Sequence, residues 1–81
     1  MTKLPRDING FELSKKLKIL GYKITRQNGS HIRLSTAVNG EHHITIPRHD
    51  PLKIGTLAGI LQDLSLHHKM ERNELITKVF G

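Results

Sequence analysis

Two Asn-Gly pairs, at residues 28–29 and 39–40, divide the middle of the chain into three short segments in which polar and apolar residues alternate. The segments span residues 22–26, 31–36 and 42–47. Alternation with a period of two is typical of strands that bury one face, and Asn-Gly between two such segments indicates a β-hairpin. The pattern therefore predicts a three-stranded antiparallel meander with one apolar face and one polar face.

The register of these hairpins follows from parity, because directly opposed residues of antiparallel strands share a face. A three-residue loop at the first turn places Ile24 opposite Ile32, whereas a two-residue Asn28-Gly29 loop would place it opposite Arg33. The same argument favours a three-residue loop ending at Gly40 in the second turn. We therefore expect three-residue loops at both turns.

The polar face of the predicted sheet is basic and carries two histidines. In the expected register, Thr25 lies opposite His31, and Lys23 lies opposite Arg33. The residues that we expect on this face are Lys23, Thr25, His31, Arg33, Ser35, His43 and Thr45.

Helical patterns flank the predicted sheet. Residues 9–20 begin with a good N-cap, Asn9, and have Glu12 three residues later in a capping-box arrangement. A second helix is expected from about Gly55 and a third from about 71 to 80. The order αβββα, with an extra C-terminal helix, predicts a two-layer α+β fold whose helices cover the apolar face. The expected apolar stripe of the first helix is Phe11, Leu13, Leu17 and Leu20.

Composition limits the classes of protein to which the chain can belong. Its 81 residues suit a single domain over 1–81 with a modest core and no large buried cavity. The net charge of +6 favours a polyanionic partner such as nucleic acid. The absence of cysteine excludes disulfides and thiolate metal sites. Because the sequence has neither a long apolar run nor a signal-peptide pattern, we expect a cytoplasmic protein that does not enter the membrane.

His31 is the first candidate for chemistry, since it follows the first turn and lies on the basic face. RNA cleavage can use the neighbouring 2′-hydroxyl as nucleophile, and an imidazole can take its proton or protonate the leaving oxygen near neutral pH. A surface histidine without a role is the alternative. His43 shares this face, but four residues along the strands place it about 13 Å away. That distance is too long for the two histidines to act on one phosphodiester.

Three further histidines are not expected to belong to a site. His42 should face the apolar side of the sheet, and His67-His68 should lie in a linker between helices. Adjacent residues on a strand point to opposite faces, so His42 and His43 cannot chelate one ion. We therefore expect no metal site and no cofactor.

A second set of basic residues lies around the start of the second helix. Lys53 precedes this helix, and Thr56 belongs to its first turn. Free N–H groups at a helix N-terminus attract anions, and Arg48 and His49 come from the same loop. An ordinary solvated loop is the alternative. Because Tyr22 should face the core, the open face offers no aromatic ring for base stacking, which favours recognition of the RNA backbone.

Three stretches of the sequence, in this order and spacing, resemble the HicA family of bacterial toxins, which are mRNA interferases. The stretches are residues 21–34, which contain Arg26-Gln27-Asn28-Gly29-Ser30-His31, then residues 45–49, and then residues 53–61. The resemblance extends over about residues 9–66, with a similar helical tail to about residue 80.

The resemblance implies a fold like that of double-stranded-RNA-binding domains, ribosome-independent cleavage of mRNA, and inhibition by a HicB-type antitoxin. The catalytic histidine of the family corresponds to His31, and its glycine and hydroxyl residue correspond to Gly29 and Ser30. Ala58 departs from the family, since relatives often have a basic residue at this position. The family positions at the second helix correspond to Lys53, Gly55 and Thr56.

The sequence thus predicts an mRNA-cleaving toxin in which His31 is the general acid or base. A non-catalytic RNA-binding module of the same fold is one alternative, and a domain that binds only an acidic protein is another. A second proton-transfer group would favour the enzyme, and His49 and Lys53 are the candidates. The expected RNA contacts are Gly29, Ser30, Lys23, Arg33, Arg48, His49, Lys53 and Thr56.

Overall fold

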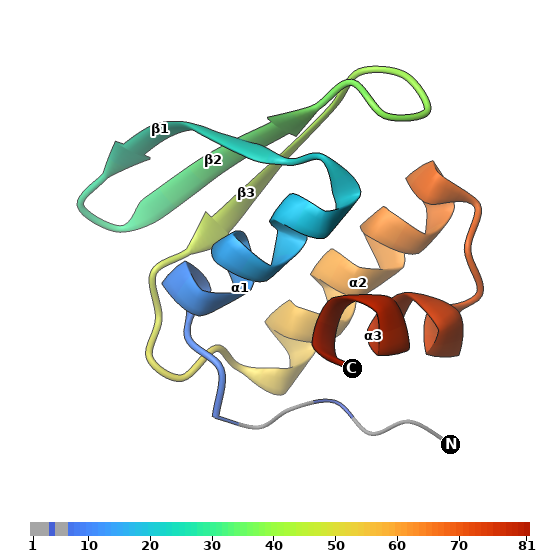
Figure 1. Ribbon diagram of the computed structural model, residues 1–81. Coiled ribbons are helices and arrows are strands. Elements are labelled where there is room, and N and C mark those ends of the chain that lie inside the picture. The colour runs from blue at the N-terminus through green and yellow to red at the C-terminus, as the bar shows by residue number, and fades with distance from the viewer. Residues whose placement is uncertain (1–3, 5–6) are drawn as a thin grey trace.

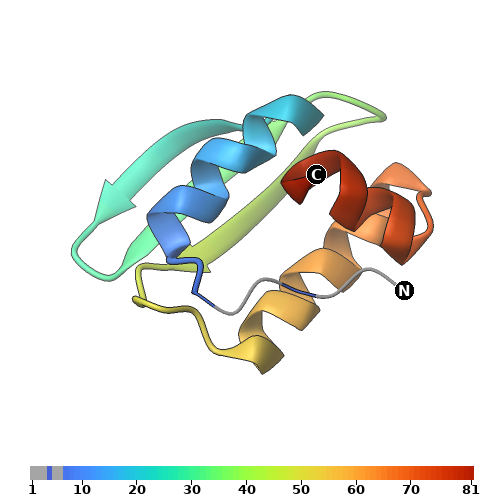
Figure 2. The same ribbon diagram turned by 60° about the horizontal axis from the view of Figure 1, so that its bottom comes forward.

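A computed structural model describes residue 4 and residues 7–81. It has an antiparallel sheet of order β1-β2-β3, and the helices lie together on one face of it (Figure 1). Turning the molecule shows the same two layers, with the other face of the sheet left open (Figure 2). This α+β architecture confirms the predicted fold class. The elements are α1 (Gly10–Lys16), the 3-10 helix η1 (Leu17–Leu20), β1 (Lys23–Asn28), β2 (His31–Thr36), β3 (His42–Pro47), α2 (Ile54–His68) and α3 (Arg72–Phe80).

The first helix begins as its sequence predicts. The Asn9 side-chain oxygen accepts the backbone N–H of Glu12 at 2.8 Å, and its amide nitrogen donates to the Glu12 carboxylate at 2.9 Å. The first of these bonds satisfies a backbone donor that a helix start otherwise leaves unpaired, and the second links the two side chains. The last turn tightens into η1 and ends at Gly21, whose φ of 84° is a left-handed conformation that glycine adopts without strain.

The prediction that Phe11 belongs to the apolar stripe of this helix is wrong. Leu13, Leu17 and Leu20 are buried, but Phe11 is 37% exposed. The three leucines follow one another at spacings of four and three, which is one face of a helix. Phe11 lies two residues before Leu13, so it projects from the opposite side of the helix. There it carries the Lys15 ammonium over its ring, 4.6 Å from the centroid.

The first hairpin also differs from the prediction. Asn28 pairs with His31, so the loop contains only two residues, Gly29 and Ser30. Further along the ladder Ile24 pairs with Leu34. The expected three-residue loop, with its pairing of Ile24 and Ile32, is therefore wrong.

A β-bulge explains how the short loop keeps the apolar face intact. The register shifts by one between Ile24 and Arg26, which leaves Thr25 as the extra residue of β1. An extra residue on one strand exchanges the faces of everything beyond it. The bulge therefore returns Ile24 to the core side, the same result that a longer loop would have given.

The second hairpin has the predicted register but a longer loop. Leu34 lies opposite Ile44, as expected. The ladder ends at the pair of Thr36 and His42, so residues 37–41 form the connection instead of three residues. The Thr36 hydroxyl accepts the N–H of the second loop residue at 3.1 Å and donates to a carbonyl of η1 at 3.1 Å. These side-chain bonds join the start of the connection to the end of η1.

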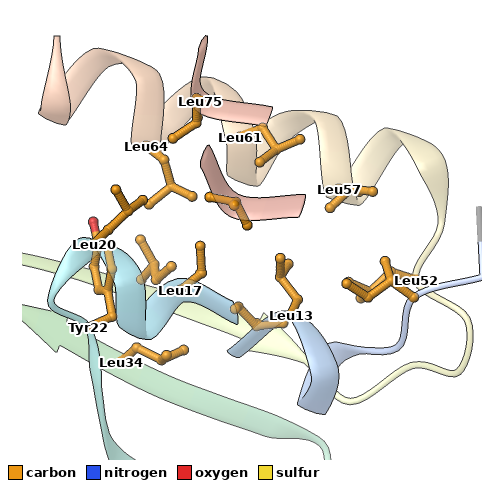
Figure 3. Close-up of a cluster of buried hydrophobic side chains, with 14 of the residues drawn as sticks. Leu13, Leu17, Leu20, Tyr22, Leu34, Leu52, Leu57, Leu61, Leu64 and Leu75 are labelled. Carbon is orange, nitrogen blue, oxygen red and sulfur yellow. The ribbon is translucent and has the colours of Figure 1, made fainter. Parts of the chain in front are cut away.

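The core lies between the sheet and the helices (Figure 3). Leucines of α1, η1 and α2 meet apolar side chains of the sheet, and α3 covers the outside of this layer. Tyr22 is also buried there, as predicted. None of the helices in the described part of the chain is long and apolar enough to cross a membrane. The fully or almost fully buried apolar residues of the sheet and the last two helices are Ile32, Leu34, Ile44, Ile46, Leu57, Leu61, Leu64, Leu75, Ile76 and Val79.

Candidate nucleic-acid interface

The helices leave one face of the sheet open (Figure 2). The charged side chains that the strands place on this face are basic: Lys23, Arg26 and Arg33. Pairing and alternation determine which side chains project there, since opposed residues share a face. The carboxylate of Glu41 lies at one end of this face, 3.4 Å from the ring of His43. The outward residues of the three strands are Lys23, Arg26, Asn28, His31, Arg33, Ser35, His43 and Thr45.

His31 is exposed at the end of this face, directly after the Gly29-Ser30 turn. The Ser30 hydroxyl oxygen lies 2.9 Å from Nδ1 of the His31 ring. The backbone N–H of His31 donates to the Asn28 side-chain oxygen at 3.2 Å. These contacts involve the backbone and Nδ1 of His31, so Nε2 is the ring nitrogen that lies away from Ser30.

The loop after β3 begins beside this turn. The backbone N–H of Arg48 donates to the Ser30 carbonyl at 2.9 Å, and Pro47 pairs with His31. The start of α1 holds the loop from the other side, because the Gly10 N–H donates to the His49 carbonyl at 3.1 Å. A Cβ at Gly10 would collide with the Pro47 carbonyl oxygen, so this close approach requires glycine.

The bulge changes the neighbours of two residues of the predicted polar face, Lys23 and Thr25. Lys23 lies opposite Ser35 and not opposite Arg33. Ser35 is four residues along β2 from His31. Thr25 does not oppose His31, and its hydroxyl instead donates to the Arg33 carbonyl at 3.3 Å. Both expected pairings depended on the three-residue loop that the structure replaces with a bulge.

Arg26 takes the place opposite Arg33, and the sequence pattern did not identify it as a site residue. In regular pairing, the alternation that places Ile24 in the core also places Arg26 on the core side. The register shift at Thr25 turns Arg26 outward. The sequence did contain a sign of this arrangement, because a two-residue Asn28-Gly29 loop would place apolar Ile24 opposite charged Arg33. Either a bulge or a longer loop removes this mismatch.

Lys53 and Thr56 lie further from His31. Lys53 is the exposed N-cap residue of α2, and no side chain caps the helix start. Figures 1 and 2 show the start of α2 and the β1–β2 turn at separate corners of the molecule. Residues 48–53 connect the end of β3 to α2. The structure thus brings Arg48 beside the Ser30-His31 turn but does not bring Lys53 and Thr56 there.

A second group of histidines lies at the other end of the sheet. The Tyr22 hydroxyl is 2.6 Å from His42 Nδ1 and 3.1 Å from His68 Nε2. His42 Nε2 is 3.3 Å from a carboxylate oxygen of Asp63, and the His67 ring stacks on His42 at a centroid distance of 4.3 Å. The prediction that His67-His68 is a linker is wrong, because both residues belong to the last turn of α2. They lie there because α2 continues to the end of the sheet, where the Tyr22 hydroxyl provides a partner for His68.

This group is part of the folded core and not of the open face. A carboxylate only accepts hydrogen bonds, so His42 carries its proton on Nε2 and accepts the Tyr22 O–H at Nδ1. The Tyr22 oxygen then accepts from His68 Nε2–H. Burial, with a smaller contribution from Asp63, raises the pKa of Tyr22 to about 12. Burial, and then the neighbouring His67, His42 and Lys78, lower the pKa of His68.

A metal site needs several histidine, aspartate or glutamate side chains gathered around one point. Among residue 4 and residues 7–81, no three such side chains are arranged to hold a metal ion.

Comparison with known families gives one match. A family model described as "HicA toxin of bacterial toxin-antitoxin" matches residues 10–66, which is more than half of the chain. The matched range contains the sheet, α1 and most of α2. No curated protein and no solved structure matches the chain.

Proposed function

Because the chain belongs to the HicA toxin family of bacterial toxin–antitoxin systems, we propose that it is an endoribonuclease that cleaves mRNA in the cytoplasm and is inhibited by a HicB-type antitoxin. In this proposal residues 1–81 act as one catalytic domain. The observation that carries it is the position of His31, exposed on an uncovered basic face with one ring nitrogen bound to Ser30.

The proposed reaction is a transesterification within the RNA. The 2′-oxygen attacks the adjacent phosphorus, its proton leaves to a base, and the bond from phosphorus to the 5′-oxygen breaks. The leaving oxygen takes a proton, so the products are a 2′,3′-cyclic phosphate and a 5′-hydroxyl. His31 serves as the base or the acid in this step, a role that typically contributes about 10²- to 10⁴-fold to the rate. No metal ion is required, because the RNA supplies the nucleophile.

Positive groups near His31 would hold the RNA and stabilise the extra charge on phosphorus. Arg33 lies two residues along β2 from His31, and Arg48 is joined to Ser30 through its backbone N–H. The Gly29-Ser30 turn lets the RNA backbone approach closely, since nothing lies within 4 Å of where a Gly29 Cβ would be. We assign supporting RNA contacts to Lys23 and His49, and contacts with a more distant part of the RNA to Lys53 and Thr56.

The antitoxin partner follows from the same surface. A net charge of +6 and an open basic face suit a protein with carboxylates on its binding surface. Inhibition would require that the partner cover His31 and exclude RNA.

The test compares wild-type protein with His31→Ala during expression in bacteria, with Arg72→Gln as the control. Arg72 is exposed on α3, in the helical layer and away from the open face. We expect growth arrest and RNA degradation for wild type and Arg72→Gln, and neither for His31→Ala. Equal arrest and degradation by wild type and His31→Ala would contradict the catalytic role.

Two further measurements separate the alternatives. Purified His31→Ala should still bind RNA, which distinguishes loss of chemistry from loss of folding. Wild-type protein that binds RNA without cleaving it would instead identify a non-catalytic RNA-binding module. Cleavage should continue in the presence of a chelator such as EDTA, and protection of the RNA by the chelator would contradict the metal-independent mechanism.

A further inference from the structure

Two arginines lie directly opposite each other on the open face. Arg26 of β1 pairs with Arg33 of β2, and both side chains are exposed. Opposed side chains on one face of an antiparallel pair have Cβ atoms only about 5 Å apart, and like charges in this position destabilise a sheet. Within residue 4 and residues 7–81, neither guanidinium has a carboxylate at ion-pair distance. The stability of the fold therefore does not explain why the two arginines lie opposite each other.

The bulge at Thr25 creates the pair. Without the register shift between Ile24 and Arg26, Arg26 would project toward the helices. The Thr25 hydroxyl fixes the bulge by donating to the carbonyl of Arg33, at 3.3 Å. One local irregularity thus brings a second guanidinium to the outer face beside Arg33.

A shallow groove runs over this part of the sheet. Its lining is polar or basic: Thr25, Arg26, Arg33, Ser35 and His43. Arg33 lies two residues along β2 from His31, which is about 7 Å at the rise of a strand. The groove therefore continues the surface that carries His31.

We propose that Arg26 and Arg33 together form a subsite for one phosphodiester of the RNA backbone, beside the nucleotide on which His31 acts. The inference rests on the proposed function for its ligand. Each guanidinium donates paired N–H groups that match the oxygens of a phosphate, and a bound phosphate offsets the repulsion between the arginines. The repulsion in the free protein is therefore relieved on binding.

The test measures binding without cleavage. A labelled single-stranded RNA oligonucleotide is titrated with His31→Ala protein and with the same protein carrying Arg26→Gln, Arg33→Gln, or both. The matched control is Arg72→Gln in the same background, since Arg72 is an exposed arginine of α3, in the helical layer. Binding is followed by fluorescence anisotropy at about 50 to 200 mM KCl, a range over which phosphate contacts show their salt dependence.

We expect Arg26→Gln to weaken binding about five- to tenfold and to reduce the slope of log K against log salt by about 0.7 to 1, as for one lost phosphate contact. Arg72→Gln should leave both quantities unchanged. Because one phosphate shares the two arginines, the double variant should lose less affinity than the product of the single losses. Multiplicative losses would overturn the shared subsite, and unchanged binding of Arg26→Gln would overturn the role of Arg26.

The melting temperature gives a second test, because loss of a residue with a structural role would lower the Tm. Arg26→Gln removes a like-charge contact, so its Tm should equal or slightly exceed that of the parent protein. A lower Tm would identify Arg26 as a structural residue and overturn the proposal. If wild-type protein fails to cleave RNA while Arg26→Gln still weakens binding, the proposed nuclease fails and the subsite stands. If wild type cleaves and Arg26→Gln binds like Arg72→Gln, only the subsite fails.

Discussion

At the scale of single residues, the contact between Ser30 and His31 determines how the imidazole can act. A hydroxyl at 2.9 Å from Nδ1 orients the ring and selects which nitrogen faces the open side. Both residues are exposed at a turn, so this orientation depends on a local bond and not on packing. The Ser30 carbonyl also accepts the backbone N–H of Arg48, which joins this turn to the loop after β3.

Ser30→Ala should therefore slow cleavage without unfolding the protein. A hydrogen bond of this kind contributes about 0.5–1.5 kcal/mol, which corresponds to a rate loss of roughly twofold to tenfold. Single-turnover cleavage assays measure this loss, with Ser30→Thr as the variant that keeps the hydroxyl. An unchanged rate would show that Ser30 does not position His31.

At the scale of secondary-structure elements, glycines at two helical positions have opposite roles. Gly10 in the first turn of α1 allows the helix to contact the backbone of Pro47 and Arg48, and a Cβ there has no space. Gly59 lies in the middle of α2 on an exposed side, where an added methyl group would have nothing within 4 Å. Close packing therefore requires glycine at position 10. Gly59 fills no such need and only increases the entropy of the unfolded chain.

Alanine at these two positions should change stability in opposite directions. Gly10→Ala should lower the free energy of unfolding by about 1–3 kcal/mol, since the helix must move away from β3. Gly59→Ala should raise it by about 0.4–1 kcal/mol. At about 4–8 °C per kcal/mol for a domain of this size, thermal melts followed by circular dichroism resolve both shifts. A Gly10→Ala protein as stable as wild type would contradict the close approach of α1 to the loop after β3.

At the scale of the whole molecule, the group of Tyr22, His42 and His68 joins the start of β1, the start of β3 and the end of α2. Its hydrogen bonds run in one direction, from His68 to Tyr22 to His42, and a neutral His68 with its proton on Nε2 can donate the first of them. Burial lowers the pKa of His68 in agreement with this arrangement. His68 therefore binds a proton less readily in the folded protein than in the unfolded chain.

Stability should consequently fall at acidic pH. The pKa of His68 is below its ordinary value of 6.5 in the folded protein, so the unfolded state binds the proton first as the pH decreases. The contribution of His68 is complete above about pH 6.5 and is lost as the pH falls through the folded value. Melts between about pH 5 and 8 should show a Tm that decreases below pH 6.5, and His68→Gln should flatten this decrease. The control is His31→Gln, an exposed histidine that should leave it intact, and equal pH dependence of wild type and His68→Gln would exclude this cause.

Much of the fold could be predicted from periodicity, because the buried faces of strands and helices repeat at fixed intervals. The N-cap at Asn9, the pairing of Leu34 with Ile44, and the burial of Tyr22 follow from such local patterns. The error at Phe11 came from including a residue two positions away from the leucine stripe. His31 could be identified as a candidate from its turn and from the resemblance to the HicA family, and the family match confirms the membership of the chain.

Alternation along the strands was enough to require one apolar face on the sheet, since Ile24, Ile32 and Leu34 have to meet the helices. It left open how the first hairpin satisfies this requirement. A longer loop and a β-bulge restore the same parity, and the choice depends on the energies of the turn and of the bulge within the folded sheet. The bulge at Thr25, and with it the outward position of Arg26 opposite Arg33, is therefore a property of the assembled tertiary structure that local pattern does not specify.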